Sequence, residues 1–368
     1  MDEAVDLSVV IVNWNVWELL GQCLRSILAP GVRVGAASGT LAVQAAADGE
    51  GGASETLAVQ AAMVQASAVW RLAVEGAPAC TVEVIVVDSA SSDGSVEMVR
   101  RAFPEVGLYA SAENLGYTGG NNLGIEASRG RYVLVLNPDT EVIGAALQAM
   151  VAYMEGHPEV GVLGPQLLWP DGRVQSSRRR FPTVGTALIE STFLQKWFPR
   201  HPALRRYTML DRPDDAVSEV GWVSGACMMV RRAAFEGVGL LDDGYFMYSE
   251  EMDWQKRMQG VGWKVVYWPQ AQVRHYEGKS SEQVVALRHI RFGRSKVRYF
   301  RKHHGRAAGA LVRAWLLVNY AYEWTVEALK WCVGHKRALR WERMGVYGEV
   351  LGSGLKAPPQ SPADHGRT

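Results

Sequence analysis

The chain has 368 residues, of which 48% are hydrophobic and 21% charged, so it is long enough to bury a sizeable core in a globular protein. Its formal net charge of +1 argues against nucleic acid as a partner of the whole surface. The four cysteines form no Cys-x-x-Cys pair and indicate neither a zinc knuckle nor a disulfide framework, which fits a reducing cytosol (Cys23, Cys80, Cys227 and Cys332).

Strand and helix patterns alternate along the first part of the chain. The first residues lack the basic stretch and the length of a secretory signal, so we expect no export. An apolar run at residues 7–12 precedes a helical pattern that stops at Pro30, and a second strand at 82–87 ends on Asp88. A short strand follows near Leu108, and then residues 114–122 form a flexible polar loop that opens a helix. This alternation predicts right-handed crossovers and a mainly parallel sheet.

Between residues 31 and 79 the alternation stops, and the composition shifts to Ala, Gly, Val, Gln and Ser. The heptapeptide Thr-Leu-Ala-Val-Gln-Ala-Ala occurs at 40–46 and again at 56–62. Two copies are too few for a solenoid, and a structureless connection of this length inside a compact unit is either functional or disordered. We therefore expect residues 31–79 to be a surface insertion that carries no catalytic residue.

The next strand, at residues 132–136, runs straight into the polar turn Asn-Pro-Asp-Thr. The strand must stop at Asn137, because Pro138 has no N–H to donate to a neighbouring strand. Asp139 is therefore expected at the carboxyl end of a buried strand, where open α/β sheets bind their ligands. Alternatively, Asn137 and Asp139 only form a turn and cap a helix that begins near Val142.

A second polar cluster lies at residues 242–257, where aromatic residues precede three acids. Ser249 is suited to cap a helix, and Glu250, Glu251 and Asp253 suit the positive end of the helix dipole. This structural interpretation explains the acids but neither the aromatic residues before them nor His275. His275 follows another strand pattern at 263–267, and it is either a ligand or a hydrogen-bonded structural histidine.

Seven motifs in a fixed order resemble those of the family 2 glycosyltransferases, and most of all their rhamnosyltransferase-like branch. The similarity covers residues 7–281 without the insertion. It implies a GT-A fold: an α/β, Rossmann-like, mainly parallel mixed sheet flanked by helices. The motifs are Val-Ile-Val-Asn-Trp-Asn, Val-Ile-Val-Val-Asp88, Asn114-Leu-Gly-Tyr-Thr-Gly-Gly-Asn-Asn, Leu-Asn-Pro-Asp139, Trp-Val-Ser-Gly-Ala, Tyr-Ser-Glu-Glu-Met-Asp-Trp and His275-Tyr-Glu-Gly.

The resemblance also implies roles for individual residues. Asp139 and His275 would bind a divalent Mg²⁺ or Mn²⁺ ion, and Glu251 would be the general base, with Glu250 and Asp253 as alternatives. The acceptor would contact Trp222, Ser224, Gly225 and Tyr248. The nucleotide-diphosphate sugar would contact Asn13, Asn15, Asp88, Gly116, Gly119, Gly120, Asn121 and Asn137.

The expected function is inverting transfer of a sugar such as rhamnose to a lipid-linked or polysaccharide acceptor in cell-surface glycan synthesis. Two residues depart from the commoner family pattern, because Asn137 stands at the first acidic place of Asp-x-Asp and Glu251 replaces an aspartate. These departures support an alternative, a nucleotide-sugar-binding protein with impaired catalysis. A dinucleotide oxidoreductase fits less well, because no Gly-x-Gly-x-x-Gly follows the first strand.

The region after residue 281 has a different character and is predicted to be a helical C-terminal extension over 282–356. Basic residues recur from Arg288 to Arg306 without an acid among them, and residues 311–331 are rich in Leu, Val, Trp and Tyr. Four charges interrupt that apolar stretch, so it falls short of a membrane-spanning helix. It is either an interfacial helix at the cytoplasmic face of the cell membrane, or a helical pair packed on the catalytic domain or in a homodimer. The tail, 357–368, is expected to be disordered.

Overall fold

The computed structural model describes residues 4–28, 31–35, 61–73, 78–278 and 281–356. The chain divides into two compact units, which are described separately here. The sheet unit consists of Met1–Arg179, Arg212–Gly244 and Glu251–Ser280. The helical unit consists of Arg180–Asp211, Tyr245–Glu250 and Ser281–Thr368. Besides the expected C-terminal extension, the helical unit therefore takes in two segments from the middle of the chain.

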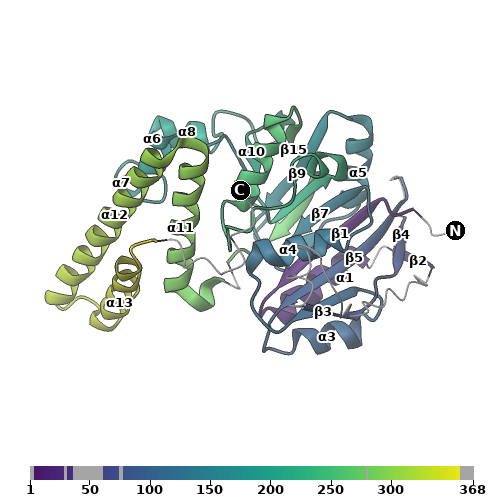
Figure 1. Ribbon diagram of the computed structural model, residues 1–368, viewed down its shortest axis with the longest axis horizontal. Coiled ribbons are helices and arrows are strands. Elements are labelled where there is room, and N and C mark those ends of the chain that lie inside the picture. Colours follow the sequence, from purple (N-terminus) through teal and green to yellow (C-terminus); the bar gives the residue numbers. More distant parts are fainter. Residues whose placement is uncertain (1–3, 29–30, 36–60, 74–77, 279–280, 357–368) are drawn as a thin grey trace, which may run out of the picture. The chain divides into compact units, whose positions relative to one another are not determined.

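A large mixed sheet forms the centre of the sheet unit (Figure 1). Its middle strands β6, β5, β1 and β7 are mutually parallel, and β14 inserts antiparallel between β7 and β9. This arrangement confirms the predicted α/β sheet. The strands of the middle and of the far side are β1 (Leu7–Asn13), β5 (Cys80–Ser89), β6 (Gly107–Ser111), β7 (Tyr132–Leu136), β14 (Cys227–Arg231), β9 (Val160–Leu168) and β15 (Lys264–His275).

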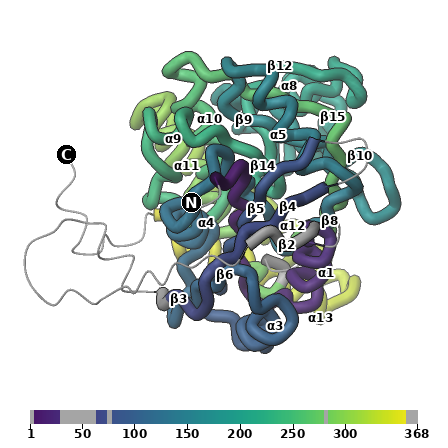
Figure 2. The backbone as a smooth tube through the Cα atoms, turned by 90° about the vertical axis from the view of Figure 1, so that its right-hand side faces the viewer, coloured from purple at the N-terminus to yellow at the C-terminus, as the bar shows by residue number. Residues whose placement is uncertain are grey.

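Helices cover both faces of this sheet, as the tube in Figure 2 shows for α1 and α4 on either side of β5. On one face, alternate side chains of β1, β5 and β7 pack with apolar residues of α1 (Trp17–Leu28), α3 (Ser95–Ala102) and α5 (Ala146–Gly156). On the other face, Leu123 of α4 (Gly116–Glu126) packs against Ile85 and Val87. Apolar residues on both faces of a strand are what a central parallel strand requires.

Close packing of α4 on β1 explains two of its glycines. A Cβ atom on Gly120 would lie 2.7 Å from Val12, and one on Gly124 would lie 2.3 Å from Val10. Any larger side chain at these positions would push the helix away from the sheet. The sequence placed residues 114–122 in a flexible loop, whereas the structure places Gly116 and its successors inside α4.

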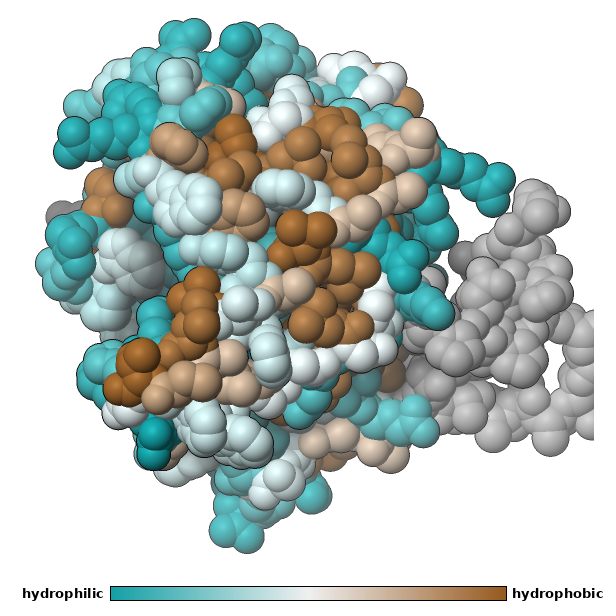
Figure 3. All heavy atoms as spheres, turned by 90° about the vertical axis from the view of Figure 1, so that its left-hand side faces the viewer, coloured by the Kyte–Doolittle hydropathy of each residue, from teal (hydrophilic) through white to brown (hydrophobic). Residues whose placement is uncertain are grey.

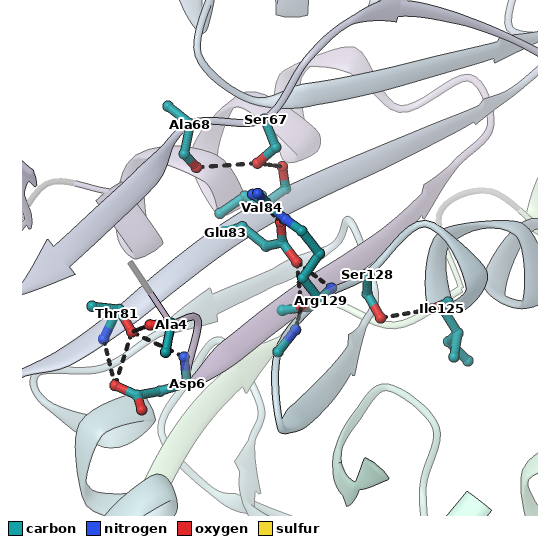
Figure 4. A network of polar contacts seen from close by, with 12 residues as sticks. Ala4, Asp6, Ser67, Ala68, Thr81, Glu83, Val84, Ile125, Ser128 and Arg129 are labelled. Carbon is teal, nitrogen blue, oxygen red and sulfur yellow. Dashed lines mark hydrogen bonds and ion pairs between the residues drawn. The ribbon is translucent and has the colours of Figure 1, made fainter. Parts of the chain in front are cut away.

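A buried carboxylate joins the amino-terminal ends of β1 and β5 (Figure 4). Glu83 accepts hydrogen bonds from the Ser8 hydroxyl at 2.6 Å and from Nε of Arg129 at 2.9 Å. Nearby, Asp6 accepts a hydrogen bond from the Thr81 N–H at 2.8 Å. Since a buried charge is tolerated only when it is paired and hydrogen-bonded, this network fastens the strands at the edge away from Asn13 and Asp88.

The predicted surface insertion contributes to the sheet, which corrects the expectation from sequence. β4 (Val69–Leu72) pairs antiparallel with β5, and β2 (Gly31–Gly35) pairs with β4. β3 (Ala61–Gln65) pairs with β6. The first copy of the heptapeptide repeat lies outside the described residues. A helix expected near Val142 is also absent there, because β8 (Thr140–Val142) pairs with β15 and α5 begins only at Ala146.

The helical unit is built around three long helices, which confirms the predicted helical extension. α11 (Val285–His304) packs on α12 (Arg306–Cys332), and α12 packs on α13 (Arg337–Ser353). The short helices α6 (Val184–Ile189) and α7 (Phe193–Trp197) pack against α12, where the Phe193 ring lies 4.5 Å from that of Tyr322. Among the described residues, no helix is both long enough and apolar enough to cross a membrane.

The remaining elements are small. In the sheet unit they are β10 (Val174–Gln175), β11 (Arg178–Arg179), β12 (Ser218–Glu219), β13 (Trp222–Val223), α9 (Arg232–Glu236) and α10 (Glu250–Gly260), whose first residue belongs to the helical unit. In the helical unit they are α8 (Pro202–Tyr207) and the 3-10 helix η1 (Ser281–Val284).

Candidate functional site

One edge of the sheet gathers polar residues from four strands. β1 and β5 run parallel with Asn13 opposite Asp88, so both strands end at the same edge. β7 is parallel to β1, and Asn137 follows directly after it. β14 runs the other way, so its first residues lie at this edge too, and the Asn137 N–H donates to the Ala226 carbonyl at 2.9 Å. Carboxyl ends of parallel strands are where such sheets bind ligands.

Asn13, Asn15 and Asp88, which the resemblance assigned to the nucleotide, lie together at this edge. Nδ2 of Asn13 donates to Oδ2 of Asp88 at 2.8 Å and to the Ser91 hydroxyl at 3.1 Å. Asn15 has a left-handed backbone with φ of 53°, and its side-chain oxygen accepts from the Ser92 N–H at 2.8 Å. Oδ1 of Asn13 is buried and has no hydrogen-bond partner in the described structure. A buried acceptor of this kind is a ready contact for a donor group on a ligand.

Ser91 joins the three predicted residues and was not predicted. Besides the bond from Asn13, its hydroxyl accepts from the Asn15 N–H at 3.0 Å. Its own N–H donates to Oδ1 of Asp88 at 2.9 Å. The only sequence signal for this role is the Ser-rich turn directly after Asp88.

Asp139 and His275 are brought together as predicted. Thr140, next to Asp139, stands opposite His275 in the pairing of β8 with β15. Nε2 of His275 lies 3.3 Å from Oδ1 of Asp139, and the Asn137 side-chain nitrogen lies 3.5 Å from the same Nε2. Asp139 and His275 are both buried. Two residues separated by 136 positions thus share one site.

Gln175, at the end of β10, orients the His275 ring. Its Oε1 lies 2.9 Å from Nδ1 of His275, while its Nε2 donates to Oε2 of Glu277 at 2.6 Å. Because Glu277 takes the amide hydrogen, Oε1 faces the ring and Nδ1 must carry the hydrogen. The other ring nitrogen, Nε2, faces Asp139. A ligating histidine is commonly held in this way by a hydrogen bond to its other ring nitrogen.

The residues around Asp139 fit a divalent cation. A carboxylate oxygen and an imidazole nitrogen 3.3 Å apart can share a cation or a proton between them. Oxygen and imidazole nitrogen suit Mg²⁺ or Mn²⁺. No cluster of three or more His, Cys, Asp or Glu ligands occurs in the part of the chain that the structure describes.

The first turn of α4 holds the residues predicted to cradle the sugar or its diphosphate. Gly116 has φ of 69°, and its N–H donates to the Asn114 side chain at 2.9 Å. Thr118 and Asn121 are buried, and Oγ1 of Thr118 and Oδ1 of Asn121 have no hydrogen-bond partner in the described structure. Of the predicted glycines, Gly120 lies against Val12, and Gly119 is next to Leu115 of the same turn. Thr118 therefore joins the candidates.

Glu251 lies beside Gly225 and Tyr117. A Cβ atom on Gly225 would lie 3.5 Å from Cβ of Glu251 and would collide with the Tyr117 hydroxyl, so a larger residue there would displace Tyr117. That hydroxyl donates to the Gly225 carbonyl at 2.7 Å. Glu251 of α10 is thereby placed next to the turn between β13 and β14 and the start of α4. Ser224, another predicted acceptor residue, lies in the same turn and accepts from the Ala226 N–H at 3.3 Å.

The other residues of the aromatic and acidic cluster have separate positions. Trp222 lies in β13 opposite Arg179, and Gln255 of α10 accepts from the Val223 N–H at 2.8 Å. Asp253 is fully buried and pairs with Arg257. In the helical unit, Tyr248 packs edge-on against Phe292 with centroids 5.8 Å apart.

The backbone before α10 is strained. Tyr248 and Ser249 have φ of 74° and 68°, a region that non-glycine residues enter at a cost and mostly at functional sites. Ser249 therefore lacks the extended conformation of an N-cap, contrary to the expectation from sequence. Glu250, the first residue of α10, is buried.

Comparison with known proteins identifies the family of the chain. The model for glycosyl transferase family 2 matches residues 67–239. An N-acetylglucosaminyl-diphospho-decaprenol L-rhamnosyltransferase of Mycobacterium tuberculosis is 34% identical over 212 residues, which cover 54% of this chain and 68% of the relative. A low-salt glycan biosynthesis hexosyltransferase of Haloferax volcanii is 26% identical over 175 residues, which cover 46% of this chain and 51% of that protein.

Solved structures with a similar course of the chain include a mannosyltransferase from Pyrobaculum calidifontis in complex with GDP-Man and Mn²⁺. The similarity has a TM-score of 0.48 at 14% identity and covers 96% of this chain and 88% of that protein. A structure of GalNAc-T7 with UDP, GalNAc and Mn²⁺ gives a TM-score of 0.45 at 14% identity and covers 75% of this chain but only 44% of that protein.

Proposed function

Because the chain belongs to glycosyltransferase family 2, we propose that it transfers L-rhamnose or a similar sugar from a nucleoside-diphosphate donor to a sugar on a lipid diphosphate. The name of the Mycobacterium tuberculosis relative supports both the sugar and the acceptor. The observation that carries the proposal is the convergence of Asn13, Asp88, Asp139 and Glu251 around one edge of the sheet, described above. The place of action that follows from a lipid-linked acceptor is the cytoplasmic face of the cell membrane.

In the proposed reaction, the carboxylate of Glu251 takes the proton of the acceptor hydroxyl as its oxygen attacks the anomeric carbon. The bond from that carbon to the diphosphate oxygen breaks, the nucleoside diphosphate leaves with the electron pair, and the configuration inverts. One base suffices for such a displacement. Tyr117 and Gly225 hold the turn beside Glu251 and thereby position the base.

Asn13, Asn15 and Asp88 bind the nucleoside in this proposal, and Thr118 and Asn121 at the start of α4 bind the sugar or diphosphate. The free acceptor atoms of Asn13 and Asn121 match donor groups such as sugar hydroxyls or a base amide. Asp139 and His275 would hold a divalent cation, which would stabilise negative charge on the leaving diphosphate. Asn137 contributes no charge here, so the cation depends on Asp139 and the substrate.

Donor binding and turnover test the proposal. Calorimetry of the full chain with a panel of nucleotide sugars, with and without Mn²⁺, should identify one donor whose affinity rises with the metal. Asp139→Ala should abolish that rise, whereas Asp171→Ala, at an exposed carboxylate of the β9–β10 hairpin, should keep it. If Asp139→Ala kept the Mn²⁺-dependent affinity for the donor, the proposed metal site would be refuted. A chain that binds donor but neither hydrolyses nor transfers it would instead be a binding protein with impaired catalysis.

A further inference from the structure

Helix α12 of the helical unit has polar residues on its buried side. Oδ1 of the buried Asn319 accepts from the Phe193 N–H at 2.7 Å. Glu323 pairs with Lys196, and Glu327 pairs with Arg340 at 2.7 Å. Burial by itself raises the pKa of Glu327, but hydrogen bonds from Arg340 and Lys330 bring it below the ordinary value. The acidic side chains in the middle of α12 are thus paired with basic side chains of the same unit.

The outward side of the same helix is apolar. Its fully exposed residues include one charged residue, Arg306 at its start, and the Lys330 side chain near its end is 44% exposed. Over 27 residues, or about 40 Å of helix, most of the exposed residues between Arg306 and Lys330 are therefore apolar. The buried side also carries Val312, Leu316 and Tyr320, so α12 is apolar on both sides, whereas a surface helix usually has a polar outward side. The exposed residues after Arg306 are Ala307, Ala310, Leu311, Ala314, Val318, Ala321, Trp324, Thr325, Leu329 and Cys332.

Aromatic and apolar residues of neighbouring segments extend this side of the unit. Trp197 of α7 is 57% exposed and packs edge-on against Tyr322 of α12, with centroids 5.6 Å apart. At the far end of α12, Val333 is 80% exposed, and Trp341 of α13 is 65% exposed. Figure 3 looks onto the side that carries α12 and shows several brown apolar areas there. Exposed apolar surface of this extent marks an interaction site.

Charge is distributed very unevenly between the two units. The helical unit has 21 Lys and Arg residues against 9 Asp and Glu, whereas the sheet unit has 18 against 29. The formal charges are therefore +12 and −11, which nearly cancel in the whole chain. Basic residues also flank the apolar side of α12, since Lys336 and Arg337 follow it and are exposed. The near-neutral total charge conceals this asymmetry.

We propose that the outward side of α12, with Trp197 and Trp341, is a docking surface for an anionic lipid bilayer. Apolar and tryptophan side chains insert at the level of the head groups, and the surrounding lysines and arginines attract anionic lipid. A second copy of the chain fits this surface less well, because it would bring two units of formal charge +12 together. The proposal rests on the proposed function only in that a lipid-linked acceptor gives the docking a purpose.

Vesicle sedimentation of the full chain tests this surface. Wild-type protein should bind vesicles of phosphatidylcholine with about a third phosphatidylglycerol at least tenfold more strongly than pure phosphatidylcholine, and added salt should weaken the binding. The double variant Val318→Glu, Leu329→Glu places charges at positions that are 53% and 63% exposed, so it should fold. Its binding to anionic vesicles should fall at least tenfold. The matched control Val261→Glu, at a position of the sheet unit that is 61% exposed, should bind like the wild type.

Two outcomes would overturn the proposal. Undiminished vesicle binding by the folded double variant would move the docking site elsewhere. A wild-type dimer in light scattering that the double variant turns into a monomer, without vesicle binding by either, would assign the surface to a second copy. Donor hydrolysis and transfer to a short-chain soluble acceptor should be equal in wild type and double variant. A wild type that binds vesicles but has no transferase activity would refute the proposed function and leave the docking surface intact.

Discussion

Asp253 lies two residues after Glu251 in α10, and its carboxylate accepts a hydrogen bond from Nε of Arg257 at 2.9 Å. Asp253 is fully buried, and Arg257 also donates to the carbonyls of Val238 and Leu240, at 2.6 Å each. The pair therefore ties α10 to the segment that follows α9. A carboxylate held in this way stabilises the fold and is poorly placed to take a proton from a substrate. Of the three acids predicted as bases, Glu251 and Glu250 therefore remain the candidates.

The first prediction concerns Glu251. Glu251→Gln keeps the size and hydrogen bonding of the side chain but removes its capacity to accept a proton. We expect kcat to fall by about two to four orders of magnitude, the usual range for loss of a general base, with donor affinity little changed. Steady-state kinetics and calorimetry measure the two effects. Retention of most activity by this variant would move the role of base to Glu250.

Asp253→Asn is the matched comparison and the second prediction. It leaves Arg257 without its anionic partner, and breaking a buried pair costs roughly 3 kcal/mol in the free energy of unfolding. We expect urea unfolding to show this loss, while the folded fraction keeps kcat within a few-fold of the wild type. A stable Asp253→Asn protein without activity would contradict the structural role and identify Asp253 as the base.

The third prediction concerns Gln175. Gln175→Leu removes the acceptor that holds the Nδ1 hydrogen of His275, so the ring is free to turn or change tautomer. Loss of such a supporting bond typically lowers metal affinity 10–100-fold, and we expect the Mn²⁺ concentration for half-maximal donor binding to rise accordingly. Donor binding measured in EDTA serves as the internal control and should not change. An unaltered Mn²⁺ titration would show that Gln175 does not orient a ligand.

The fourth prediction is a pH dependence of stability from Asp6. Burial by itself raises the pKa of Asp6, but hydrogen bonds from Thr81 and Arg131 outweigh it, so the pKa lies below the ordinary value of an aspartate. A lowered pKa in the folded protein contributes stability at pH values above the pKa that the carboxyl has in the unfolded chain. This contribution is lost as the pH falls through the pKa of the folded protein. Asp6→Asn should therefore cost about 1–2 kcal/mol at pH 7 and clearly less at pH 2, below the pKa of the unfolded carboxyl.

Urea unfolding at the two pH values measures this difference. Glu159→Gln, at a carboxylate that is 47% exposed and 3.9 Å from Lys264, is the control and should be close to the wild type at both. A cost for Asp6→Asn that is the same at pH 7 and pH 2 would show that packing, and not ionisation, is responsible.

The fifth prediction follows from the strands within residues 31–79. Replacement of this whole segment by a short Gly-Ser linker would remove β2, β3 and β4. Of these, β4 pairs with β5, with Val69 opposite Glu83 at one end and Leu72 opposite Cys80 at the other. We therefore expect a lower midpoint of thermal unfolding and exposure of the β5 edge, with aggregation as a consequence. Calorimetry and light scattering measure both. A deletion protein as stable and monomeric as the wild type would restore the interpretation of the segment as a dispensable insertion.

The sequence by itself determined the strands β1, β5 and β7, the turns that end them and the family. These features are local, because an apolar run followed by Asn, Pro or Asp specifies where a strand stops whatever surrounds it. The order of the motifs then indicated that Asp139, His275 and Glu251 belong to one reaction.

Only the tertiary structure decided which neighbours these residues have. Gln175 lies 100 positions from His275, and Ser91 lies 78 positions from Asn13. At such separations, no local sequence pattern predicts either hydrogen bond. The strands within residues 31–79 depend in the same way on the distant edge of β5, which overrides their low-complexity composition. The direction in which α12 turns its residues likewise depends on distant partners. Lys196 pairs with Glu323 and Arg340 pairs with Glu327, so these acids face into the unit while Leu329 faces water.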